Sequence, residues 1–282
     1  APGMTSVTDN PSRFNGASLT YRAAGGNGYN NSWNWNLHYR AALSYITGSH
    51  SFKVGFNNAR GYHDNTTYAD PATPYTYSFA NGVPNSITYR ILPRTVRVDV
   101  DRDLGVFVQD RWTTGRWTLS GGLRYDNFRN SFPETAIAGT FFGRSLNVQF
   151  PDTDNLNWHD ITPKMGATYD VFGNGRTALK VTLNKYLEGL GTTGFGAAQV
   201  TDAPHPITRI SGINQNSTRT WGDANRNFVP DCNLNNFEAN GECGPLSGAA
   251  TWGTLVGGTS YDPDLMEGWG KRANNWEFTA GV

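Results

Sequence analysis

The chain has 282 residues, which is enough for one large β-domain or two ordinary ones. Its 23 Lys and Arg residues balance its 23 Asp and Glu residues, so the net charge of zero gives no general attraction to nucleic acid. No run of about 18 apolar residues occurs, which excludes a transmembrane helix.

The composition is poor in aliphatic residues but rich in aromatic residues and glycine. Hydrophobic residues make up 37% and the mean hydropathy is −0.53, yet aromatic residues reach 13% and there are 33 glycines. A soluble core of this size normally needs more aliphatic residues. A large membrane barrel needs fewer, because half of every strand faces a watery lumen. The composition therefore favours a membrane barrel.

The first part of the chain predicts two hairpins. A Gly-, Asn- and Ser-rich beginning contains one short predicted strand at 17–22. In the first hairpin, at 39–56, apolar and polar residues alternate on both sides of a turn at Thr47–His50. A polar connection follows at 61–74. The second hairpin, at 75–91, turns at Asn81-Gly82, which is a strong turn dipeptide.

The clearest hairpin lies at 104–128, after a predicted strand at 96–100 that runs toward it. In its second strand, apolar residues alternate with polar ones from Trp117 to Tyr125. These two aromatic residues are separated by roughly 26 Å at ~3.3 Å per residue. This matches the ~25 Å apolar band, edged by aromatic girdles, of a membrane barrel. In the first strand Asp110 falls on the apolar face, which either a bulge or the end of the membrane band near Gln109 would explain.

The rest of the chain alternates between short turns and long connections. A connection at 129–160 contains a predicted short strand at 146–150, and a hairpin at 164–184 turns at Gly173–Gly175. Little strand pattern appears at 189–271, which we interpret as a long external loop region, and a last strand begins at Trp276. Short turns on one side and long loops on the other are typical of outer-membrane barrels.

These patterns predict an all-β fold, an antiparallel transmembrane β-barrel with long external loops. Roughly nine or ten segments read as strands. A closed single-chain bacterial barrel needs an even number and no exposed edge. Since the sequence stops within a strand, we expect residues 1–282 to form part of a larger barrel. No charged and then apolar leader stands at Ala1, so either a signal was removed or the chain begins inside a longer protein.

Three motifs resemble TonB-dependent outer-membrane receptors. Val106–Trp112 (VFVQDRW), followed by Leu119–Asp126 (LSGGLRYD), resembles the family's "YVQD.W … L.LG.GLRYD" hairpin. Ile161–Asp170 (ITPKMGATYD) resembles its "PR.G..YD" strand. Asp223–Cys232, together with Asn240–Gly244, resembles an external loop of the Oar-like subgroup, which carries a carboxypeptidase-regulatory-like domain ahead of its plug and barrel.

The resemblance implies a 22-stranded barrel with a plug domain inside, energised by the TonB system of the inner membrane. This sequence departs from the family pattern, because it has no plug, no TonB-contacting segment and no C-terminal aromatic strand end. We therefore interpret it as the barrel portion of such a receptor. The expected partners are outer-membrane lipid, the plug domain and TonB system of the parent protein, and a small nutrient ligand, with no nucleic acid.

The two cysteines, Cys232 and Cys243, lie close together in one Gly- and Asn-rich stretch. Their spacing predicts a local disulfide and an oxidising compartment. The alternative is a pair of free thiols in a cytosolic protein. A structural zinc site is not expected, because no further cysteine or paired histidine accompanies them.

Calcium is the one cofactor that the sequence suggests. Oxygen-bearing side chains occupy positions 1, 3, 5 and 9 of a calcium-loop-like pattern, namely Asp223, Asn225, Asn227 and Asp231. The pattern has Phe228 in place of the usual glycine at the sixth position and Leu234 in place of a bidentate Glu at the twelfth. The alternative is an Asx-rich turn whose side chains bond to their own backbone.

Aromatic residues of the long loop region are the candidate ligand-binding residues. They could stack on a sugar or another flat ligand, or they could pack the loop itself; they are Trp221, Trp252, Tyr261 and Trp269. We predict no catalytic residue, because no G-x-S-x-G, P-loop or HExxH motif occurs and the five histidines are scattered.

Our first hypothesis is a non-enzymatic segment of a TonB-dependent receptor in the bacterial outer membrane. It would import a scarce nutrient such as an iron chelate, a vitamin or a glycan. The alternative is a structural or interaction β-protein of the cell envelope, or a secreted calcium-stabilised β-sandwich that binds glycans.

Overall fold

The computed structural model describes residues 5–12, 16–21, 29–68, 74–189, 213–255 and 262–282. The described chain is built almost entirely of β-strands, with a single four-residue helix, α1 (Pro263–Met266). No helix in these ranges is long and apolar enough to cross a membrane.

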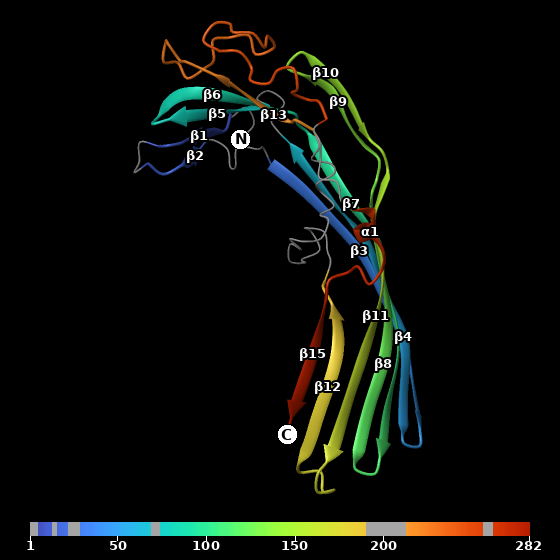
Figure 1. Ribbon diagram of the computed structural model, residues 1–282. Helices are drawn as coiled ribbons and strands as arrows, with labels where there is room; N and C mark the ends of the chain where they lie inside the picture. Colours follow the sequence, from blue (N-terminus) through green and yellow to red (C-terminus); the bar gives the residue numbers. More distant parts are fainter. Residues whose placement is uncertain (1–4, 13–15, 22–28, 69–73, 190–212, 256–261) are drawn as a thin grey trace.

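A long, curved, antiparallel sheet forms the body of the molecule (Figure 1). Its strands run in the order β15-β12-β11-β8-β7-β4-β3, and β14 pairs in parallel with β11. Their bounds are β3 (Tyr29–Thr47), β4 (His50–Tyr68), β7 (Arg94–Thr114), β8 (Trp117–Phe132), β11 (Thr153–Asp170), β12 (Ala178–Leu187), β14 (Glu267–Trp269) and β15 (Asn274–Gly281). In the described residues β3 and β15 each pair with one neighbour, so this sheet is open.

The turns that join the long strands at one end are tight. Gly48 and Gly115 lie in two of these turns with φ of +54° and +56°, a conformation that favours glycine. The third turn, between β11 and β12, contains Gly173 and Gly175 with φ of +69° and +71°. All three turns lie together at the lower end of the sheet in Figure 1. The expected asymmetry between short turns and long connections is therefore present.

The opposite end of the long sheet carries a second sheet, in the order β13-β6-β5-β1-β2, and a separate hairpin (Figure 1). The strands of the second sheet are β1 (Val7–Asp9), β2 (Leu19–Tyr21), β5 (Tyr75–Ala80), β6 (Val83–Arg90) and β13 (Asn216–Thr220). The hairpin consists of β9 (Thr135–Phe141) and β10 (Arg144–Phe150). The predicted turn at Asn81-Gly82 is confirmed, with φ of +54° and +74° at the two residues.

The main hydrophobic core lies at this end and not along the long sheet. It packs the second sheet and the β9–β10 hairpin against the segment that follows β13. Its most buried residues include Val7, Ile87, Tyr89, Trp221 and Trp252. We call this end of the molecule the outer domain: strands β1, β2, β5, β6, β9, β10 and β13, with the loop segment 221–255.

The strands are longer than the sequence predicts. The expected connection at 61–74 is strand β4 as far as Tyr68, and the expected connection at 129–160 contains the end of β8, the hairpin β9–β10 and the start of β11. Both predictions of a connection were therefore wrong over most of their length, whereas the short strand predicted at 146–150 is confirmed as part of β10. Polar residues become frequent on both faces here, so the apolar alternation fades although backbone pairing continues.

The irregular pattern around Gln109 is not a bulge. Pairing between β4 and β7 is continuous there, and the register shifts instead between Ala59 and Gly61. Asp110 therefore stays on the apolar face, where its carboxylate lies 2.7 Å from Nδ1 of His50. Asp110 pairs with Gly121 of β8, which lies halfway between Trp117 and Tyr125, so the register does not place the end of the membrane band near Gln109 either.

Candidate functional site

One face of the long sheet is continuously apolar. The strand register places Leu43, Val54, Val108, Leu123 and Pro163 side by side across five strands. Their side chains have no covering layer in the described chain, since Leu43 is 69% and Val108 is 52% exposed. A secreted β-sandwich would bury this face under a second layer. The exposed apolar row instead has the character of a lipid-facing barrel surface.

Aromatic rings edge the apolar face near the turns. The rings of Trp117 and Tyr169 lie 4.6 Å apart, and the ring of His50 stacks on those of Phe52 and Trp112. Indole and phenol groups prefer the level of the lipid headgroups because they are amphipathic. This cluster corresponds to the lower aromatic girdle of a barrel.

A second aromatic cluster edges the same face toward the outer domain. Tyr125 Oη and His159 Nδ1 are 2.7 Å apart, and the Trp269 ring lies 5.3 Å from the His159 ring. The sequence predicted Trp117 and Tyr125 as the two edges of the apolar band. The two aromatic clusters contain these residues and lie at the two ends of the apolar face, one near the turns and one toward the outer domain. Trp269, a candidate ligand residue, thus lies on the membrane-type face and points away from the polar one.

The opposite face of the sheet is polar. The register aligns Lys53, Gln109, Gly122, Lys164 and Asn184 as a second row across five strands. Together with their neighbours they line a cavity of 510 Å³ on this face. A row of amide and ammonium groups suits contact with water and polar solutes, as in the lumen of a barrel.

Toward the outer domain, the polar face carries fixed charges of both signs. Arg124 Nε lies 2.7 Å from a carboxylate oxygen of Asp126, and its Nη1 donates to Asn57 Oδ1. Arg272, in the segment before β15, donates to the carbonyl of Glu188 and interacts electrostatically with Asp126 and with its neighbours Asp103 and Asp160. These charged groups place a polar, hydrogen-bonded lining at the outer end of the lumen face.

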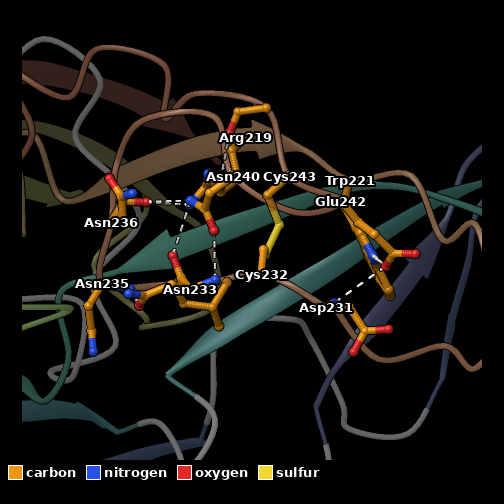
Figure 2. Close-up of a disulfide and its surroundings, with 12 residues drawn as sticks. Arg219, Trp221, Asp231, Cys232, Asn233, Asn235, Asn236, Asn240, Glu242 and Cys243 are labelled. Carbon is orange, nitrogen blue, oxygen red and sulfur yellow. Dashed lines mark hydrogen bonds between the residues drawn. A yellow bond between two sulfur atoms is a disulfide. The ribbon is translucent and has the colours of Figure 1, made fainter.

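The disulfide between Cys232 and Cys243 is present, as predicted. It closes a loop that wraps around the buried side chain of Arg219 (Figure 2). Arg219 donates to the carbonyls of Gly244, Asn236 and Glu238, and its Nη1 also donates to Tyr89 Oη at 3.1 Å. Burial raises the pKa of the Tyr89 hydroxyl even though the Arg219 guanidinium opposes the shift. The loop is thus fixed to β6 and β13 by one hydrogen-bonded arginine.

Asn240 closes the same loop from within (Figure 2). Its side-chain amide donates to the carbonyls of Asn236 and Glu238, and its Oδ1 accepts from the backbone N–H of Asn233. The next residue, Gly241, has φ of +53°, and a Cβ there would collide with the carbonyl oxygen of Asp231. The outer loop therefore has one specific conformation.

The candidate calcium residues do lie together, but their side chains bond to the loop itself. Asp223 accepts from the backbone N–H groups of Asn227 and Phe228, and Asp231 accepts from the side-chain amides of Asn225 and Asn227. These are the contacts of an Asx-rich turn. In the described part of the chain, no group of three or more His, Cys, Asp or Glu side chains is placed to hold a metal ion. Calcium binding stays a prediction.

Two of the candidate ligand residues are core residues. Trp221 is 2% and Trp252 is 0% exposed, so their ring faces are covered by the outer core. Tyr261 lies outside the described residues. Sequence reasoning missed the arginines of the outer domain. Arg219 shares the buried face of β13 with Ser217, whereas Thr218 and Thr220 are exposed. The stretch Asn216–Thr220 contains no apolar residue, so no hydrophobic alternation marked this arginine in the sequence.

The two-faced sheet, its aromatic edges and its tight turns define the class of the protein, a wall of a membrane β-barrel. A family model described as "TonB dependent receptor-like, beta-barrel" matches residues 4–203. The chain therefore belongs to the TonB-dependent receptor family, whose members are receptors and transporters and are typically found in the bacterial outer membrane. Neither a search of curated proteins nor a search of solved structures found a match.

Proposed function

We propose that this chain forms part of the wall of a receptor that imports a small, scarce nutrient across the outer membrane. The observation that supports this proposal is the difference in character between the two faces of one sheet, with the pair of His50 and Asp110 as an exception on the apolar face. The row through Val108 is apolar and exposed, whereas the row through Gln109 is polar and lines a cavity. A wall with lipid on one side and a solute passage on the other requires this arrangement.

The proposal includes the rest of the barrel. Further strands would pair with the open edges at β3 and β15 to complete a barrel of 22 strands. A plug domain would fill the lumen against the polar face, and the TonB system would supply the energy. We also propose that the receptor is of the Oar-like type. The rigid loop around Arg219, which carries the Asx-rich stretch and the disulfide, supports this assignment.

In this proposal the outer domain receives the ligand before it enters the lumen. It lies at the end of the sheet away from the tight turns (Figure 1). Its loop is held by a disulfide and by buried hydrogen bonds, so its surface is preformed. A preformed surface loses little conformational entropy when it binds. The iron chelates, vitamins and glycans of the first hypothesis all remain candidate ligands.

The function is tested by growth of the source bacterium under limitation by one nutrient at a time. Deletion of the gene should abolish growth on one iron chelate, vitamin or glycan, and loss of the TonB system should have the same effect. Reintroduction of the gene should restore growth. If growth with and without the gene is the same on every nutrient of the panel, import is not the function.

A structural or interaction role in the cell envelope is the second candidate. The preformed outer domain favours it, because a docking surface needs rigidity but no passage through the wall. In that case deletion should leave uptake unchanged and weaken the envelope. Sensitivity to detergents and large antibiotics measures the envelope directly and separates the two candidates.

A further inference from the structure

A small polar pocket lies where β6 of the outer domain leads into β7 of the long sheet. It has a volume of 190 Å³ and is lined by side chains from four segments, among them Thr67, Arg90, Arg94, Gln215 and Asn216. All of its polar lining groups are cationic or neutral. Its described lining therefore combines two arginines with no carboxylate.

The two arginines differ from the others in the described chain. Nε of Arg90, and Nε and Nη1 of Arg94, are buried nitrogens without a hydrogen-bond partner. The side chain of Arg90 makes one long contact, 3.5 Å from Nη1 to Asn216 Oδ1. By contrast, Arg124 and Arg129 pair with carboxylates, and Arg219 donates to carbonyl groups.

The charges of the two guanidinium groups are also uncompensated. Burial lowers the pKa of both arginines, and among the described residues no carboxylate acts against the shift at either one. A buried charge without a partner is unfavourable, because it loses its hydration. Folded proteins that keep such groups commonly use them to bind an ion of opposite charge.

The register places the pocket on the lumen side of the wall. Arg94 lies on the same face of β7 as Val96, Val98 and Val100, and Val100 pairs with Asn130 of β8. Asn130 lies on the same face of β8 as Arg124, which belongs to the polar face. Arg90 alternates with Tyr89 and Ile91 of the outer core, so its side chain lies on the opposite face of β6 from that core.

We propose that Arg90 and Arg94 form an oxyanion-binding site that holds a carboxylate or phosphate group of a soluble ligand at the outer mouth of the lumen. Guanidinium groups present planar pairs of N–H donors that match the two oxygens of such groups. The pocket is large enough for one oxyanion and too small for a whole iron chelate or oligosaccharide, so it would hold one acidic group of a larger ligand. This assignment of ligand chemistry rests on the proposed import function.

The test is thermal unfolding of the purified protein in a detergent without phosphate groups. Inorganic phosphate and citrate should each raise the midpoint temperature relative to chloride at equal ionic strength, because a ligand that binds only the folded state stabilises it. The double variant Arg90→Gln/Arg94→Gln should lose this increase. Arg129→Gln is the matched control, since its guanidinium already pairs with Asp154 and its loss should leave the increase intact.

Binding of citrate by titration calorimetry gives the affinity directly. Each single variant should weaken it by about tenfold or more, as expected for loss of a charge-assisted hydrogen bond. The variant Arg94→Lys separates loss of binding from loss of the fold, because it keeps the positive charge but removes the planar pair of N–H donors. It should bind more weakly than the native protein while its circular dichroism spectrum stays native.

Two results would overturn the proposal. One is an increase in midpoint temperature that survives in the double variant. The other is that free phosphate and citrate leave the midpoint temperature unchanged, whereas vesicles of phosphatidylglycerol raise it in the native protein but not in the double variant. That result would assign the site to a lipid headgroup. Neither measurement depends on uptake, so a failed growth experiment and a failed oxyanion site can be told apart.

Discussion

At the scale of single residues, the outer domain depends on a few polar side chains that are buried and fully bonded. Arg219 is 1% exposed, yet its guanidinium reaches three carbonyl oxygens and the Tyr89 hydroxyl. Such a group gives the loop a single geometry, because any other arrangement leaves a buried donor or acceptor unpaired.

Replacement of Arg219 by methionine should destabilise the outer domain by about 3 kcal/mol or more, since several buried carbonyls lose their donor at once. Hydrogen exchange measured by mass spectrometry should show faster exchange in residues 232–246 and unchanged exchange in the long strands. The control is Arg176→Met, at an exposed position in the β11–β12 turn. Slow exchange in 232–246 of the Arg219 variant would contradict the central role of this side chain.

The raised pKa of the Tyr89 hydroxyl predicts that the outer domain becomes less stable at alkaline pH. Its pKa is raised above the ordinary value of 10.0, so the folded state holds this proton more tightly than the unfolded state does. The resulting stability is complete below the unfolded-state pKa and is lost as pH rises through the higher folded-state pKa. Tyr89→Phe should remove this part of the alkaline loss.

Urea unfolding of the native and Tyr89→Phe proteins, followed between pH 8 and 11, measures the difference between the two slopes. The variant should also lose some stability at every pH, because the hydroxyl donates to the carbonyl of Leu234. Parallel curves for the two proteins across the whole range would show that this hydroxyl does not titrate differently on unfolding.

At the scale of strands, the alternation of side chains was the reliable signal in the sequence. The face shared by Trp117, Leu123 and Tyr125 follows directly from the period of two, and the register confirms it across the neighbouring strands. Alternation did not reveal the ends of β4, β8 and β11, because both faces there are polar or buried beneath other segments. The alternation of apolar and polar residues depends on one face in water and one face in an apolar environment, so it is lost where both faces have the same environment.

Two adjacent residues of β7 test the assignment of the faces. Val108→Arg puts a charge at the middle of the apolar row and should destabilise the protein in lipid by about 2–4 kcal/mol. Gln109→Arg places the same side chain on the polar face and should be nearly neutral. Folding yield in lipid vesicles, measured by gel mobility without heating, compares the two. Equal yields would contradict the assignment.

The predicted calcium site lies in the loop segment 221–255 of the outer domain and can be tested by proteolysis. Calcium should raise the resistance of residues 223–243 to proteolysis, and Asp231→Ala should abolish this effect because that carboxylate bonds to both Asn225 and Asn227. Terbium luminescence excited through tryptophan reports occupation of the loop. Asp264→Ala, at an exposed residue of α1, is the control. Equal proteolysis with calcium and with a chelator would leave the Asx turns as the whole explanation of the pattern.

At the scale of the molecule, local patterns predicted the wall, but of the outer domain they predicted only separate parts, such as the hairpin at 75–91 and the disulfide. Two of the three family motifs, Val106–Asp126 and Ile161–Asp170, lie in the long strands, where each residue's neighbours follow from strand pairing. The outer core instead unites Val7 and Ile87 with Trp221 and Trp252. Contacts between residues so far apart in the sequence produce no periodic pattern in it. The two unpaired arginines were hidden for the same reason, because Arg90 and Arg94 become neighbours of Gln215 only after folding.

The composition of that core also dictates an order of assembly. Strand β1 near the beginning of the chain pairs with β5, while the tryptophan at 252 comes from a segment that a ribosome makes more than two hundred residues later. The outer domain can therefore be completed only after the chain has been synthesised as far as Trp252, which follows the hairpins β3–β4, β7–β8 and β11–β12 in the sequence. Completion of the outer domain would therefore be a late step in folding, and a folded outer domain would indicate that the long strands are already paired.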